Sequence, residues 1–106
     1  MKFSKESRIL KRQEFSHISK VGMRRHGTYF NLQFIPAAQK KLGISVSRKY
    51  GKAVLRNRFK RLMREAFRAT DLPNIHLNIF PQKSALSASL TDIKNELVHL
   101  TKPRTK

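Results

Sequence analysis

One stretch of sequence decides the fold: residues 48–68, which read RKYGKAVLRNRFKRLMREAFR. It holds nine Lys or Arg residues and a single acid. Apolar residues recur through it at steps of three and four, at Leu55, Phe59, Leu62, Met63 and Ala66. That spacing predicts one amphipathic helix over about residues 52–69. Such a helix can pack its apolar side on a core and turn its cationic side toward a polyanion.

The cationic side of this helix divides into two surfaces. At about 100° per residue, one flank of the apolar stripe carries Arg56, Asn57, Lys60 and Arg64. The exposed side carries Arg58, Arg61 and Arg68. Arginine suits phosphates because its planar fork can donate two hydrogen bonds at once. The alternative is a solvated helix face, but such faces normally mix charges of both signs, and this one does not.

Length and charge limit what the whole chain can be. Its 106 residues predict a single nucleic-acid-binding domain over 1–106, with a basic segment at 1–11 and a frayed tail at 102–106. The net charge of +18 repels itself in the folded chain and favours a phosphate-rich partner. There is no cysteine, no apolar run of membrane-spanning length and no apolar signal-peptide core at residues 1–12. We therefore expect a cytoplasmic protein with no membrane partner.

The residues around the long helix predict the rest of the fold. Helical spacing predicts a short helix over 13–20 and a closing helix from Leu90 to Leu100, which a capping box at residues 89–92 begins. Alternation predicts strands over 29–35, 42–47 and 75–80. The two strands that flank the long helix form a βαβ unit and should be parallel. The class is α+β: an α-β sandwich in the order α-β-β-β-α-β-α, with a short or irregular first strand and one mixed sheet packed by helices.

One face of that sheet should be polar with an aromatic component. Its predicted residues are Tyr29, Asn31, Gln33, Ser45, Ser47, His76 and Asn78. Such a face can hold an unpaired nucleic-acid strand by hydrogen bonding and stacking, or it can simply face solvent. The sequence leaves both interpretations open.

The chain offers little for catalysis. Six carboxylates are scattered with no close pair, four histidines lack the spacing of metal ligands, and the four glycines form no phosphate-binding loop. We expect no catalytic residue, no metal site and no small-molecule substrate in the protein. If a nuclease activity is associated with the chain, its catalytic groups should lie elsewhere.

The long helix and its surroundings carry a family resemblance. The residues concerned are Ile44 to Lys49, Gly51, Ala53-Val54, Arg56-Asn57-Arg58, Lys60-Arg61-Leu62 and Arg64 to Phe67. Together they resemble the protein subunit of bacterial ribonuclease P. Arg8-Ile9, Phe15, Gly22 and Phe30 extend the resemblance over about residues 8–68, whereas the C-terminal third matches only in pattern.

The resemblance implies a function that composition does not show. Ribonuclease P removes the 5′ leader of precursor tRNA with an active site made of RNA and bound metal ions, here Mg²⁺. The small protein binds ribonuclease P RNA and helps to hold the leader. The family fold is an α-β sandwich with a left-handed βαβ crossover, against the usual right-handed preference.

The resemblance also implies roles for particular residues. The precursor-tRNA leader and its cleft would involve Phe15, Arg56, Asn57, Lys60 and Arg64. The catalytic RNA would be bound by Arg48, Lys49, Lys52, Arg58, Arg61 and Arg68. The chain departs from the family at Ser19 and Gln33, where other members carry aromatic residues, and at Pro81-Gln82, where Arg-Pro is common.

The sequence thus predicts a non-catalytic RNA-binding subunit of ribonuclease P. A basic ribosome-associated protein that binds rRNA is the alternative, since it would explain the charge and the missing catalytic set equally well. The Asn57 within the Arg-rich motif argues against this alternative. A protein that only neutralises rRNA phosphates requires positive charge, but no asparagine at a fixed position. A DNA-binding module with the helix in a major groove is a third hypothesis, against which the chain shows no dimerisation element.

Overall fold

A four-stranded mixed sheet organises the protein. The computed structural model describes residues 10–102, so the predicted basic segment and frayed tail lie largely outside the described residues. The strands are β1 (Met23–His26), β2 (Phe30–Pro36), β3 (Lys41–Ile44) and β4 (Ile75–Pro81), in the spatial order β1-β2-β4-β3. β2 pairs antiparallel with both β1 and β4, whereas β3 pairs parallel with β4. The predicted parallel pair is confirmed.

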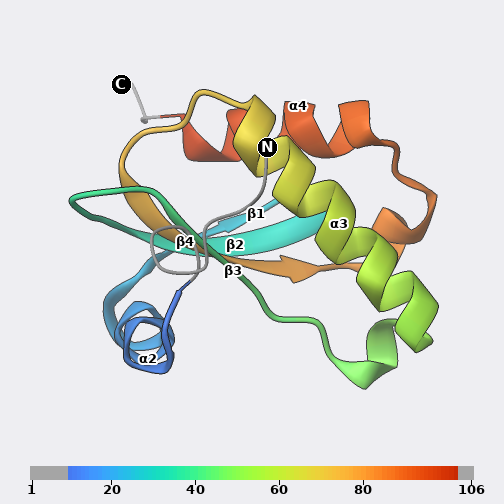
Figure 1. Ribbon diagram of the computed structural model, residues 1–106, viewed down its shortest axis with the longest axis horizontal. Helices are drawn as coiled ribbons and strands as arrows, with labels where there is room; N and C mark the ends of the chain where they lie inside the picture. Colours follow the sequence, from blue (N-terminus) through green and yellow to red (C-terminus); the bar gives the residue numbers. More distant parts are fainter. Residues whose placement is uncertain (1–9, 103–106) are drawn as a thin grey trace.

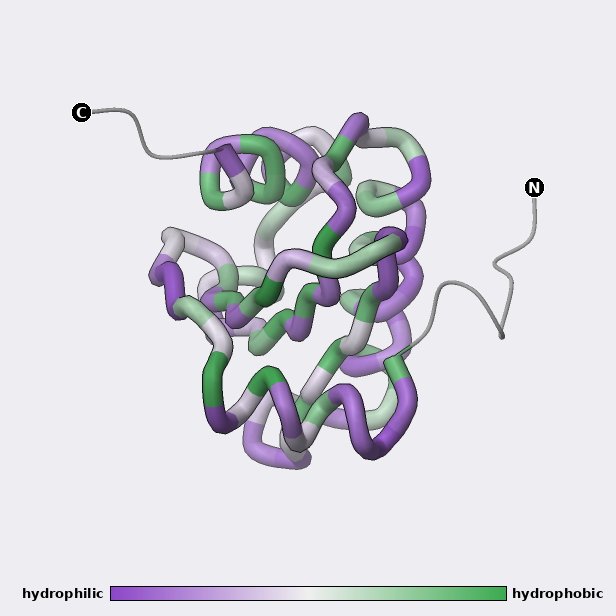
Figure 2. Tube along the Cα trace, turned by 90° about the vertical axis from the view of Figure 1, so that its left-hand side faces the viewer, coloured by the Kyte–Doolittle hydropathy of each residue, from purple (hydrophilic) through white to green (hydrophobic). Residues whose placement is uncertain are grey.

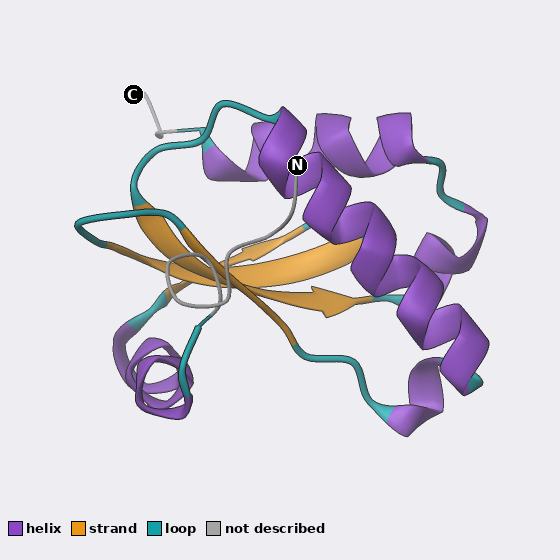
Figure 3. Ribbon diagram, in the orientation of Figure 1, coloured by secondary structure: helices purple, strands orange, loops and turns teal. Residues whose placement is uncertain are grey.

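Helices cover the two faces of the sheet unequally. Helix α2 (Arg12–Val21) lies on one face, and α3 (Ala53–Ala69) and α4 (Leu90–Thr101) pack together on the other (Figures 1 and 3). Two short 3₁₀ turns, η1 (Arg48–Tyr50) and η2 (Lys83–Ser87), precede α3 and α4. The predicted α+β class and the order α-β-β-β-α-β-α are therefore confirmed.

The crossover from β3 through α3 to β4 is left-handed. In Figure 1 the sheet is seen nearly edge-on, with β3 nearer to the viewer than β4. Both strands run from left to right, and α3 returns above them. The chain therefore turns anticlockwise as it recedes from the viewer, which is the hand opposite to that of most βαβ units.

The main core lies between the sheet and the α3/α4 layer. Alternate residues of the central strands, among them Phe30, Leu32, Leu77 and Ile79, are completely buried there. They meet fully buried side chains from both helices, namely Phe59, Met63, Ala66, Ile93 and Leu97. Figure 2 shows the same alternation of hydrophobic and hydrophilic residues along the strands. This packing follows from the period of two in the strands and the three- and four-residue steps in α3.

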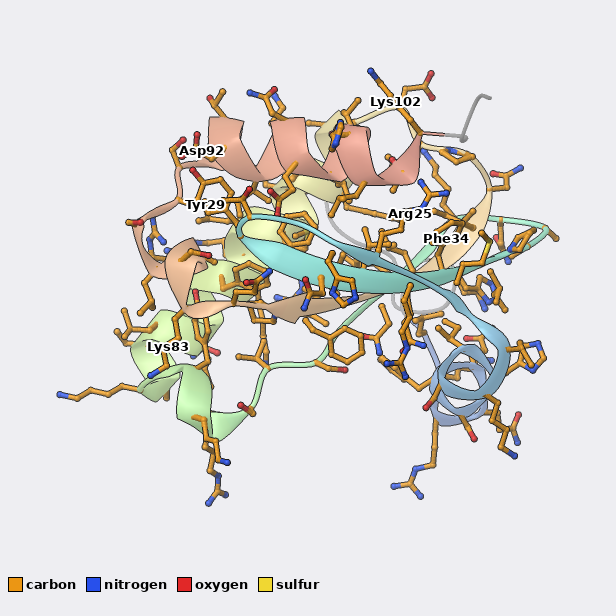
Figure 4. All side chains as sticks on the ribbon, turned by 180° about the vertical axis from the view of Figure 1, so that it is seen from behind. Arg25, Tyr29, Phe34, Lys83, Asp92 and Lys102 are labelled. Carbon is orange, nitrogen blue, oxygen red and sulfur yellow. The ribbon has the colours of Figure 1, made fainter. Side chains whose placement is uncertain are left out.

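Three predictions about this core were wrong. β3 ends at Ile44 rather than Ser47, and only the Ser45 N–H continues the ladder, to the Ile79 carbonyl at 2.8 Å. Tyr29 packs against the core instead of standing on the polar face, and Figure 4 shows it between the sheet and α4. Phe67, outside the predicted stripe of α3, is buried, because the side of α3 that carries it packs in the core.

Two clamps join α4 to the β1–β2 hairpin. The Glu96 carboxylate accepts hydrogen bonds from the backbone N–H groups of Thr28, Tyr29 and Phe30, at 2.7–2.9 Å. The Arg25 guanidinium lies 5.0 Å from the centre of the Phe34 ring and donates to the carbonyls of Leu100 and Lys102 (Figure 4). Arg25 thereby satisfies carbonyls at the C-terminal end of α4 that have no partner within the helix.

Replacing Glu96 should therefore destabilise the fold. We expect Glu96→Ala to lower the free energy of unfolding by about 1.5–3 kcal/mol, which is the contribution of one hydrogen bond to a charged group. The loss is not three times as large because water can partly replace the other two hydrogen bonds. Urea denaturation followed by circular dichroism measures it. The control is Glu65→Ala, on the exposed side of α3, which should change stability by less than about 0.5 kcal/mol. Equal losses for the two variants would contradict the clamp.

Candidate nucleic-acid interface

Helix α3 presents its cationic side as the sequence predicts. Phe59, Met63, Ala66 and Phe67 are buried, and Leu55 and Leu62 are half-buried at the edges of that apolar side. The side chains of Asn57, Arg61, Arg64 and Arg68 are exposed, and Lys60 is half-buried. The only acid of the helix is Glu65. The charged residues on the exposed side of α3 are therefore all cationic except Glu65.

Two arginines of the motif point in opposite directions. The Arg56 Nε donates to the Gly51 carbonyl at 3.2 Å, so its side chain folds back onto the turn that precedes α3. The Arg58 Nη2 donates to the Ala88 carbonyl at 3.1 Å, between η2 and α4. Arg56 thus lies on the flank that helical geometry predicts, whereas Arg58, predicted on the exposed side, is half-buried because its side chain reaches the Ala88 carbonyl. Both also hold the backbone in place, which the sequence did not reveal.

The other predicted basic residues extend this surface. Arg48 and Lys49 are exposed on η1, and Lys52 is exposed at the residue that begins α3. Tyr50 lies buried between them, in contact with Phe59 at 5.9 Å between ring centres. Burial raises the pKa of Tyr50, and the charge of Arg58 acts in the opposite direction. The ring therefore fixes η1 to α3 and keeps the neighbouring cations in solvent.

The α2 face of the sheet is arranged in rows across the strands. One row contains Ile35, His76 and Lys41, and the next contains Arg24, Gln33, Asn78 and Gly43. Helix α2 contacts members of both rows. A third row, which we call the open row, contains His26, Asn31 and Phe80. The open row lies beyond these contacts of α2, and the described residues leave it partly uncovered: His26 is exposed, and Asn31 and Phe80 are half-buried.

An open pocket of about 440 Å³ lies over the open row. Its lining residues are Ser19, Arg24, His26, Asn31, Leu32, Gln33 and Phe80. Three of them, Asn31, Gln33 and Ser19, were identified from the sequence. Phe80 was missed, although its position in the alternation of β4 places it on the same face as His76 and Asn78. The aromatic component that the sequence assigned to Tyr29 is therefore supplied by Phe80.

Phe15 lies on the same face, beside β3. A Cβ atom at Gly43 would come within 2.4 Å of the Phe15 ring, so the absence of a side chain at Gly43 lets the ring approach the sheet. Phe15 is half-buried. From β3 the chain passes Ser45 into η1. In Figure 1, η1 and α2 both lie below the sheet, α2 at the left and η1 at the right. The exposed sheet face thus lies between α2 and the basic η1 turn.

A charged cluster fixes α2 to the sheet. The Glu14 carboxylate accepts from the Lys41 ammonium at 2.9 Å and from the Lys11 N–H at 2.7 Å, and lies 3.9 Å from His76 Nε2. Burial raises the pKa of Glu14, but the Lys11 N–H and the Lys41 charge outweigh it, so the pKa lies below its ordinary value. Burial lowers the pKa of His76; Glu14 opposes this, and the Lys41 and His17 charges reinforce it.

Both shifts should make the fold less stable in acid. Glu14 stabilises the fold above its ordinary pKa and loses that effect as the pH falls through the lowered value. His76 resists protonation in the fold, so it also costs stability as the pH falls through its ordinary range near 6.5.

We expect the melting temperature of the wild type to exceed that of Glu14→Gln at pH 7, and the difference to shrink toward pH 3. A constant difference across this range would show that the Glu14 charge is unimportant.

Two further features bear on the choice of function. Among residues 10–102, no three His, Asp or Glu side chains gather as a metal site would need. Within the same part of the chain, no helix is long and apolar enough to cross a membrane.

The fold and this surface define a class: small α+β domains with a left-handed βαβ unit, a cationic crossover helix and a partly uncovered sheet face. A family model described as Ribonuclease P matches residues 3–104. The chain therefore belongs to the ribonuclease P protein family, as the Arg-rich motif predicts.

Individual relatives agree with this assignment. The chain is 37% identical over 102 residues to the ribonuclease P protein component of Chlamydia pneumoniae, covering 88% of the chain and 73% of that protein. It is 38% identical over 76 residues to the component of Thermus scotoductus, covering 72% of the chain but only 47% of that longer protein. The solved RNase P protein from Thermotoga maritima superimposes with a TM-score of 0.80 at 30% identity, covering 90% and 94% of the two chains.

Proposed function

We propose that the protein binds ribonuclease P RNA with one basic surface and the 5′ leader of precursor tRNA with the other. The observation that carries the proposal is the cationic side of α3, which continues through η1 to an uncovered polar sheet face. Glu65 is the only acid of α3, so few carboxylates there compete with phosphates for the cations. This geometry serves two RNA segments at once.

The leader surface comprises Phe15, Arg56, Asn57, Lys60 and Arg64. The cations would hold the leader phosphates, and the ring of Phe15 could stack on an unpaired base. The exposed Asn57 amide offers both a donor and an acceptor to the RNA. Phosphates and bases of a single strand can therefore be held together without a fixed sequence.

The surface for the catalytic RNA comprises Arg48, Lys49, Lys52, Arg58, Arg61 and Arg68. A folded RNA exposes many phosphates, and a cluster of cations gains affinity from each counterion that it releases. Since Arg58 also holds the Ala88 carbonyl, its contribution combines structure with charge.

The protein would support cleavage without performing it. In this scheme the RNA would hold Mg²⁺, and the ion would supply the Lewis-acid chemistry of the reaction. The side chains of the protein orient the leader and neutralise phosphates, so that two polyanions can approach each other.

A direct test separates these contributions. We expect the protein alone to cleave no precursor tRNA, and ribonuclease P RNA alone to cleave it only at high Mg²⁺. At low Mg²⁺, cleavage should depend on added protein, because protein cations replace part of the ionic screening. The assay follows release of the 5′ leader from labelled precursor. RNA-free turnover by homogeneous protein would overturn the assignment of chemistry to the RNA.

Paired substitutions test the two surfaces. Lys60→Ala with Arg64→Ala should chiefly weaken binding of precursor tRNA by the assembled complex. Lys49→Ala with Arg61→Ala should chiefly weaken binding of the catalytic RNA; Arg58 is spared because its side chain holds Ala88. Each lost phosphate contact should lower the slope of log affinity against log salt by roughly 0.7–0.9.

The control for both pairs is Lys94→Ala, on α4 and outside either surface. It should change neither binding step measurably. If both pairs weakened the same step to the same extent, the division into two surfaces would be wrong. Binding of ribosomal RNA in preference to ribonuclease P RNA would instead favour the ribosomal alternative.

A further inference from the structure

The ring of Phe80 is placed differently from most phenylalanines of the fold. Phe30, Phe34, Phe59 and Phe67 are buried in the main core. Phe80 is half-exposed at the end of β4, on the floor of the pocket over the open row. Ser19, on the neighbouring helix α2, is small and leaves the space beside the ring open. A flat aromatic surface is thus accessible from solvent.

Two amide side chains that line the pocket are held by hydrogen bonds: Asn31, which pairs with Phe80 across the ladder, and Gln33, which is only 6% exposed. The Asn31 Oδ1 accepts from Gln82 Nε2 at 2.9 Å and from the Gly27 N–H at 3.3 Å. The Gln33 Nε2 donates to the Ile18 carbonyl at 3.4 Å. Within the described part of the chain, these bonds leave the Asn31 nitrogen as a donor and the Gln33 oxygen as an acceptor. One donor and one acceptor match the hydrogen-bonding edge of an unpaired base.

The charge of the pocket favours an anion. Arg24 and His26 are exposed on the edge strand β1 and are paired across the ladder with Gln33 and Asn31. Among the described residues that line the pocket there is no acid. A phosphate beside β1 would therefore meet a guanidinium with no carboxylate competing for it.

We propose that this pocket binds one unpaired nucleotide of the precursor's 5′ leader, with its base stacked on Phe80 and its phosphate beside Arg24. The inference rests on the proposed function and adds a second aromatic position to the leader surface. About 440 Å³ lies within the size range of pockets for small ligands, roughly 300–1,000 Å³, and accommodates one nucleotide but no duplex.

The leader is favoured over the catalytic RNA for a geometric reason. The pocket lies on the α2 face of the sheet, the same face as Phe15 and Gly43. Arg58 reaches instead toward Ala88, between η2 and α4, the helix that packs on the opposite face. A strand held by Phe15 can continue over the sheet to Phe80 without crossing to the other surface.

The test uses the assembled complex of protein and ribonuclease P RNA. Affinity is measured for leader-bearing precursor and for mature tRNA, with wild type, Phe80→Leu and Phe80→Tyr. Leucine keeps apolar bulk but removes the ring, whereas tyrosine keeps the ring. We expect Phe80→Leu to weaken precursor binding about five- to hundredfold, with mature tRNA unchanged and Phe80→Tyr near wild type.

A second arm locates the nucleotide. Precursors carry a single abasic ribose at successive leader positions. With wild type, base removal at one position should weaken binding by a similar factor. With Phe80→Leu, removal at that position should have no further effect, because the stacking partner is already gone. Absence of any such coupled position would overturn the proposal.

Controls separate failure of this proposal from failure of the proposed function. Tyr29→Leu removes an aromatic on the opposite face and should leave precursor preference intact, while melting curves verify that each variant is folded. If wild-type protein adds no preference for precursor over mature tRNA, the proposed function fails. If wild type adds it and folded Phe80→Leu retains it fully, only the Phe80 assignment fails.

Discussion

The structure depends on a small number of carboxylates, which hold together a chain with 24 basic residues. Glu96 gathers three backbone N–H groups of the β1–β2 hairpin onto α4, and Glu14 fixes α2 to Lys41 on β3. Asp92 completes the capping box that begins α4. These acids act inside the fold rather than as partners for surface cations. Under the proposed function, phosphates of the RNA would face the cations of α3, and their binding would relieve the mutual repulsion of these charges.

The unequal covering of the sheet creates the surface that we propose for the leader. Two helices close one face with an apolar core, so that face can only stabilise the fold. Among the helices of residues 10–102, the other face receives only α2, which is ten residues long. Since α2 contacts two rows of the sheet and leaves the third open, polar strand residues remain accessible beside Phe80. The α2 face of the sheet therefore contains a pocket because α2 is too short to cover all three rows.

Much of this architecture could be predicted because its signals are local. The periodicity of α3, the capping box of α4 and the alternation in β2 and β4 each specify an element over a few turns or residues. The parallel β3–β4 pair follows from the helix between them. The errors arose where long-range packing decides: Phe67 packs in the core beyond the predicted stripe, Tyr29 turns into the core beside α4, and β3 stops at Ile44. The crossover hand came from family resemblance alone.

The sequence by itself determined the cationic helix, the α+β order and the family, because charge, periodicity and the Arg-Asn-Arg motif are written along the chain. Tertiary structure alone decided which side chains became structural. It turned Arg56 and Arg58 toward backbone carbonyls, made clamps of Glu14 and Glu96, and brought Ser19, His26 and Phe80 around one pocket. Phe80 lies far from Ser19 and His26 in sequence, and pairing across the sheet and the docking of α2 place the three together.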